Sequence, residues 1–153
     1  MDVTVINPLL DAFVNILPQI GFQSVAKKSV SLANTTVKNS GVMINIGVTG
    51  PLKGVVMIGM DVESAKRFAS KMMMGMEVPE LDALAQSAIC EMGNMVCANA
   101  CSHFSTAGIN GLDISPPTMM IGAGGSVRLP VPQTIVIGFT VDDIDVNIYV
   151  GLS

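Results

Sequence analysis

The chain has 153 residues, of which half are hydrophobic and 13% are charged, and its formal net charge at pH 7 is −4. This length suffices for one domain with a sizeable buried core, and the eight scattered basic residues argue against a nucleic-acid partner. No segment offers the ~20 consecutive apolar residues of a membrane span, and the N-terminus lacks an export signal, so we expect a cytoplasmic protein without membrane insertion.

The first predicted element is a helix that begins at Asn7-Pro8. Proline favours the first position of a helix, where its missing N–H is not needed. Pro18 and then Gly21 are typical of a helix end, so the helix is expected to close there. Residues 22–32 are predicted to be extended.

A β-hairpin and a second helix follow. The polar stretch 34–40 predicts a turn or a strand edge. Apolar side chains then alternate along 42–48, the sequence TGPLKG turns the chain, and 55–60 returns as a second strand. Asp61 is predicted to cap a helix. The methionines near the end of that helix predict pliable core or interface packing: Met72, Met73, Met74 and Met76.

The third helix is predicted to open at Pro79-Glu80 and to end near Gly108. Beyond it, glycines at 122–125 lack the spacing of a phosphate-binding loop and predict a turn. Two strands around Asp142-Asp143 predict a final hairpin. Hairpins among helices, without repeated strand–helix alternation, indicate an α+β fold. We expect a mixed, largely antiparallel sheet built from hairpins and packed by about three helices.

Three polar side chains interrupt the apolar third helix. Ser87, Glu91 and Asn94 have i, i+4, i+7 spacing, which places them on one face. We expect this stripe to face out and to present a carboxylate and a carboxamide together; the alternative is that they are ordinary solvated residues. The residues expected on the opposite, core-facing side are Leu84, Ala88, Met92, Met95 and Val96.

The same helix carries all three cysteines, Cys90, Cys97 and Cys101. An odd number in a cytosolic chain argues against disulfides. A zinc site that adds His103 is conceivable, but Cys-x-x-Cys spacing is missing and buried cysteine behaves as a small hydrophobe. We therefore predict no metal site, and a structural His103 that interacts with the last helix carbonyls.

The pattern Ser87-x-x-x-Glu91-x-x-Asn94 resembles the signature of the CheC/CheX chemotaxis phosphatases. The segment 114–117 and the final hairpin are similar to the CheX branch, so the resemblance covers most of the chain. It implies that residues 1–153 form a single CheX-like phosphatase domain with one site. It also implies a homodimer joined through sheet contacts, which suits the high mean hydropathy of +0.58.

The resemblance further implies an activity: hydrolysis of the aspartyl phosphate on a CheY-type response-regulator receiver. In that family the receiver supplies Mg²⁺ and a lysine, so the phosphatase needs no cofactor of its own. Asn94 would orient the attacking water and Glu91 would pair with the receiver's lysine. We expect Ser87, Gly93 and Ala98 to contact the partner, although helix packing would explain Gly93 equally well.

A second interpretation has a different functional class. A non-catalytic binding module of the same fold, such as the middle domain of the flagellar switch protein FliM, resembles this family without the Glu-x-x-Asn pair. Because this chain has both residues, the phosphatase interpretation is favoured.

Overall fold

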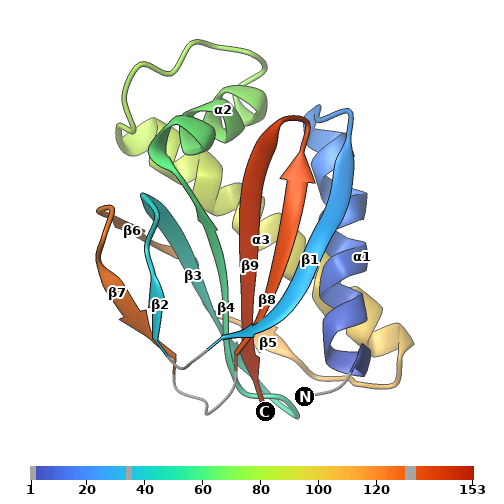
Figure 1. The fold of residues 1–153 in the computed structure, drawn as a ribbon. Helices are drawn as coiled ribbons and strands as arrows, with labels where there is room; N and C mark the ends of the chain where they lie inside the picture. The colour runs from blue at the N-terminus through green and yellow to red at the C-terminus, as the bar shows by residue number, and fades with distance from the viewer. Residues whose placement is uncertain (1–2, 34–35, 130–133) are drawn as a thin grey trace.

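The computed structural model describes residues 3–33, 36–129 and 134–153. Within these ranges the helices are α1 (Val3–Ile20), α2 (Val62–Met72) and α3 (Ala83–Thr106). Helices α1 and α3 cover one face of a seven-stranded sheet, and α2 packs against α3 at one end of it (Figure 1). The strands are β1 (Val25–Ala33), β2 (Thr36–Lys38), β3 (Val42–Thr49), β4 (Gly54–Met60), β5 (Asp113–Ile114), β6 (Thr118–Ile121), β7 (Ser126–Arg128), β8 (Thr134–Val141) and β9 (Ile144–Leu152). No described helix is long and apolar enough to cross a membrane.

The strand order in the large sheet is β1-β8-β9-β4-β3-β5, and β6 also pairs with β3. Each of these pairings is antiparallel. Strands β2 and β7 form a separate two-stranded ribbon in front of the sheet, on the side away from the helices (Figure 1). The predicted α+β fold, with a largely antiparallel sheet and three helices, is confirmed.

Several local predictions are also confirmed. β3 and β4 form the predicted hairpin, and β8 and β9 form the second one around Asp142-Asp143. The carboxylate of Asp61 accepts a hydrogen bond from the backbone N–H of Ser64 at 2.7 Å, so Asp61 caps α2 as expected. The glycine segment 122–125 connects β6 to β7 as a turn.

The start of α1 was predicted too late. The helix begins at Val3 and contains Pro8, whereas the sequence pattern placed its first position at Pro8. A proline near the start removes only one intrahelical hydrogen bond, and apolar Ile6, which is buried in the core, extends the helix in the N-terminal direction. The predicted end is confirmed, because Gly21 follows at φ 125° and donates to the carbonyl of Pro18.

The start of α3 was predicted too early. The helix begins at Ala83 and not at Pro79-Glu80, because Asp82 provides the cap: its carboxylate accepts from the backbone N–H of Ala85 at 2.9 Å. The helix ends at Thr106, near Gly108 as predicted.

The orientation of α3 is set by its close approach to β3. Gly93 is buried, and a β-carbon at this position would lie 3.2 Å from Cγ2 of Ile44 and 3.4 Å from Cδ1 of Ile46. Met92 and Val96 are fully buried beside it. The hypothesis that Gly93 contacts a partner is therefore wrong: its missing side chain lets the helix pack on the sheet.

Gly93→Leu should consequently destabilise the fold, because the larger side chain would have to displace Ile44 or lift α3 from the sheet. We expect the free energy of unfolding to fall by about 3 kcal/mol or more. Ala98→Leu, on the exposed face of the same helix, serves as the control and should change it by less than about 0.5 kcal/mol. Urea denaturation followed by circular dichroism measures both; equal stability of the two variants would contradict this packing.

Candidate active site

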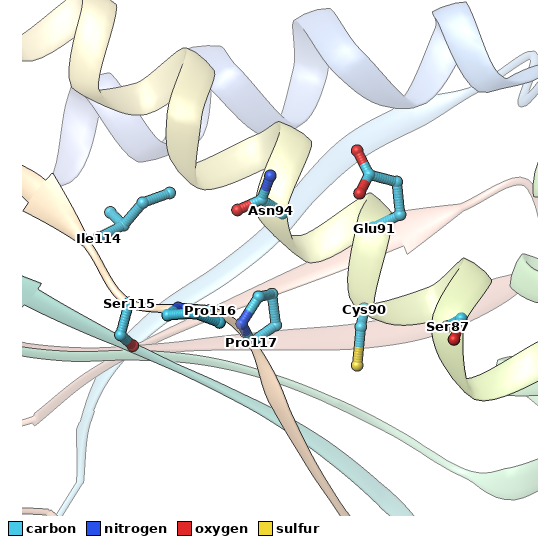
Figure 2. A pocket seen from close by; sticks show the side chains of 8 residues that line it. All are labelled: Ser87, Cys90, Glu91, Asn94, Ile114, Ser115, Pro116 and Pro117. Carbon is cyan, nitrogen blue, oxygen red and sulfur yellow. The ribbon is translucent and has the colours of Figure 1, made fainter. Parts of the chain in front are cut away.

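The polar stripe of α3 borders an open cleft of about 530 Å³. One wall is α3, and the other is the segment that joins β5 to β6 (Figure 2). Because both of these short strands pair with β3, the cleft lies along one edge of the sheet. The residues that line it are Ser87, Cys90, Glu91, Asn94, Ile114, Ser115, Pro116 and Pro117.

The wall opposite α3 is tied to the sheet. The backbone N–H of Gly47 in β3 donates to the hydroxyl of Ser115 at 2.8 Å, and the N–H of Ser115 donates to the carbonyl of Gly47 at 2.9 Å. Pro116 and Pro117 follow, and their rings restrict the backbone. The cleft is therefore held between a helix and a braced segment, rather than between mobile loops.

The stripe faces away from the core, as predicted. Ser87, Glu91 and Ala98 are exposed and Asn94 is half-buried. Figure 2 shows that the side chains of Glu91 and Asn94 project from adjacent turns on the same side of α3, while Cys90 points away from them.

The expected position of Leu84 was wrong. It was assigned to the core side, but 63% of its surface is exposed. Seven residues make nearly two complete helical turns, so Leu84 lies on almost the same line as Glu91. Met92 and Val96 are buried as predicted, and Ala88 and Met95 are half-buried against the core.

Glu91 and Asn94 are available to an external group. Among the hydrogen bonds and ion pairs of the described residues, none involves either side chain. A carboxylate accepts hydrogen bonds, whereas a carboxamide both donates and accepts them. The pair can therefore bind a cation with one member and orient a small polar molecule with the other.

The cysteines lie in three different environments. Cys90 lines the cleft, Cys97 is buried under α3, and Cys101 is half-buried. Burial raises the pKa of all three thiols, and that of Cys97 rises to about 12, first by burial and then through nearby Cys101. Metal ions bind the thiolate form, which these shifts disfavour. In the described ranges, no three His, Cys, Asp or Glu side chains are grouped to hold a metal.

His103 differs from its expected role. Its Nε2 lies 3.1 Å from the side-chain oxygen of Asn99. That oxygen also accepts from the amide of Asn15 in α1, at 3.3 Å. His103 thus belongs to a polar contact between α1 and α3, which differs from the predicted interaction with the last carbonyls of its own helix.

The second wall of the cleft is a structural part of the site that the sequence pattern did not predict. From the sequence, Ser115, Pro116 and Pro117 are indicated only by the family resemblance, and Cys90 only as a possible metal ligand. The available signal was the pair of consecutive prolines between two short apolar segments. Their position opposite α3 depends on pairing with β3, about 70 residues earlier in the chain.

Comparison with known proteins gives the family. The sequence matches the family model "Chemotaxis phosphatase CheX" over residues 42–140. It is 30% identical over 156 residues to the CheY-P phosphatase CheX of Thermotoga maritima, covering 98% of this chain and 97% of that protein.

Two solved structures share the fold. A CheC-like superfamily protein from Shewanella sp. PV-4 has a TM-score of 0.87 and 24% identity, covering 100% of this chain and 99% of that one. A chain of the CheX–CheY–BeF3–Mg²⁺ complex from Borrelia burgdorferi has a TM-score of 0.76 and 22% identity, covering 97% of each chain. With the family match and the full-length relative, the chain belongs to the chemotaxis phosphatase CheX family.

Proposed function

We propose that this chain hydrolyses the aspartyl phosphate of a CheY-type response-regulator receiver and thereby resets a chemotaxis or related two-component signal. The observation that carries the proposal is the pair of an exposed Glu91 and a half-buried Asn94, which has no partner among the described residues and borders a braced cleft. Family membership and the name of the Thermotoga relative support the reaction and its substrate.

Asn94 is the proposed water-positioning group. Hydrolysis of an acyl phosphate requires a water molecule in line with the bond that breaks, and holding it there removes much of the entropic barrier. The carboxamide can accept a hydrogen bond from that water and donate one to a phosphoryl oxygen. Because an amide does not titrate near neutral pH, Asn94 acts by orientation and not as a general base.

Glu91 is the proposed anchor to the receiver. Its carboxylate would pair with the receiver's lysine beside the phosphoryl group and so fix the register in which Asn94 enters. Ser87 and Ala98 border the same surface and are proposed to contact the partner. We propose that Mg²⁺ comes with the receiver; the BeF3–Mg²⁺ complex with CheY in the family supports this division.

We further propose that residues 1–153 act as one domain, in the cytoplasm with their receiver, and as a homodimer through sheet contacts. Support for one domain comes from the large sheet, which joins β1 near the N-terminus to β9 at the C-terminus. Support for the dimer comes from β1, the end strand of that sheet. Although β1 also carries Lys27 and Lys28, its second half exposes Val30 by 47% and Leu32 by 71%, and exposed apolar side chains on an edge strand favour contact with a second chain.

The two members of the catalytic pair should respond differently to mutation. Asn94→Ala removes the group that holds the water, so turnover should fall by about 10²-fold or more while receiver binding survives. Glu91→Gln removes the anchoring charge and should weaken binding, by roughly 2 kcal/mol if the ion pair is desolvated. Single-turnover dephosphorylation and binding to a receiver carrying an acyl-phosphate mimic separate the two effects.

The matched control is Asp145→Asn, which removes one negative charge on the opposite face of the sheet and should change neither quantity. Full activity in Asn94→Ala would refute the mechanism. An unmutated protein that binds phosphorylated receivers but hydrolyses none of them would support a non-catalytic binding module instead.

The proposed dimer should sediment as a dimer at micromolar concentration. It should remain one in high salt, because apolar contacts are not screened by ions. Leu32→Lys, which places a charge on the exposed side of β1, should shift the protein toward monomer. A strict monomer, or a dimer that salt dissociates, would count against this interface.

A further inference from the structure

Glu91 also belongs to a second line of exposed residues, a ridge that runs along α3 beside the polar stripe. Leu84, Glu91 and Ala98 are spaced by seven residues, so they lie within about 20° of one line along the helix. All three are exposed. Leu84 lies about 10 Å from Glu91 along the helix axis, at 1.5 Å per residue. An exposed leucine therefore precedes the proposed anchor on the surface that a receiver would approach.

A second cleft lies on the other side of this ridge. It has a volume of about 560 Å³ and lies between the ends of α1 and α2 and the middle of α3. Met95, which follows Asn94 directly, forms part of its floor. We call it the methionine cleft; the residues that line it are Gln19, Ile20, Lys71, Met72, Met74 and Met95.

Met74 is the unusual member of this cleft. It is 97% exposed and has a φ of 59°, just after the end of α2. A position with positive φ after a helix normally has glycine, which adopts it without strain. Here Gly75 follows, and the chain still places a large apolar side chain at position 74. With Met72 and Met95 lining the same cleft, this fully exposed side chain adds to a group of apolar side chains that a partner could contact.

The cleft offers little charge to a partner. Of the described residues that line it, one is charged: Lys71, which donates to the carbonyl of Gly21 at 3.3 Å and lies 5.7 Å from the centre of the Phe22 ring. The remaining surface is largely thioether and aliphatic. Methionine side chains adapt to differently shaped apolar groups, so this surface suits apolar side chains of a protein partner.

An interface of ordinary size would include both the ridge and the methionine cleft. A stable protein contact buries about 800 Å² on each partner, which corresponds to a disc of about 16 Å radius. A receiver centred on Glu91, which lies about 10 Å along the axis from Leu84 and about one helical turn from Met95, would therefore extend to Leu84 and to the edge of the methionine cleft. A partner that contacted only Glu91 and Asn94 would bury much less than this area.

We propose that Leu84 and the methionine cleft form the apolar part of the docking surface for the phosphorylated receiver, and that they bind apolar side chains next to its phosphorylated aspartate. This proposal rests on the proposed function of Glu91 and Asn94. In this arrangement the catalytic pair provides the chemistry, and the apolar residues determine affinity and the choice among receivers.

The test is a pair of charge substitutions at exposed positions, Met74→Lys and Leu84→Lys. Each should weaken binding to a receiver loaded with BeF3⁻ and Mg²⁺ at least tenfold. The single-turnover rate constant at saturating phosphatase should stay within twofold, because Asn94 is untouched. Met74→Leu keeps the apolar side chain and should bind within twofold of the unmutated protein. Asn147→Lys adds the same charge to the exposed opposite face of β9 and should have no effect.

Lysine variants that bind as tightly as the unmutated protein would overturn the proposal, while Asn94→Ala in the same assay reports separately on the catalytic function. Lysine variants that lose dimerisation, measured by sedimentation, would also overturn it, because the cleft would then be a contact between two copies of this chain. A rate constant that falls as much as the affinity in both lysine variants would assign these residues to catalysis instead of docking.

Discussion

The close contact between α3 and β3 at Gly93 is the constraint on which the rest of the site depends. No side chain separates the helix from Ile44 and Ile46 there, so the rotation of α3 about its axis is fixed by the core. Because Glu91 lies 200° around the helix from Gly93, it must point away from the sheet. A larger residue at position 93 would lift the helix and move the catalytic pair relative to the opposite wall. The contact between α3 and β3 at Gly93 thus both fills the core and sets the direction in which Glu91 and Asn94 point.

The second wall depends on β3 as well. Strands β5 and β6 pair with the edge of β3 at successive positions, and Ser115 closes the gap between them through two hydrogen bonds to Gly47. These strands cover an edge that would otherwise be open to pairing with another chain. They also hold two prolines opposite α3. Since both walls are attached to one strand, little ordering of this chain is required when a partner binds, which lowers the cost of association.

The sequence predicted the features that depend on local periodicity. Three features could be predicted because each is set within about ten residues. They are the alternation in β3 and β4, the cap at Asp61, and the spacing of Ser87, Glu91 and Asn94. The missed features depend on distant contacts. A glycine has no side chain to show which way it faces, so the role of Gly93 required the position of β3. Leu84 was misplaced because α3 is apolar around much of its circumference, which weakens the helical period as a guide to the buried side.

The distribution of charge explains how such a surface could distinguish its partner. Among the described residues, Glu91 is the one charged side chain that lines the cleft between α3 and the two prolines. Lys71 is the one that lines the methionine cleft, and it contacts its own chain. In the proposed reaction the receiver contributes the lysine and the metal, so additional charges here would compete with groups that the substrate already carries. The neutral amide of Asn94 can enter the receiver's phosphorylation site without changing the net charge there. With few charges in the two clefts to steer association, the proposed docking surface would distinguish receivers by shape and by apolar contact.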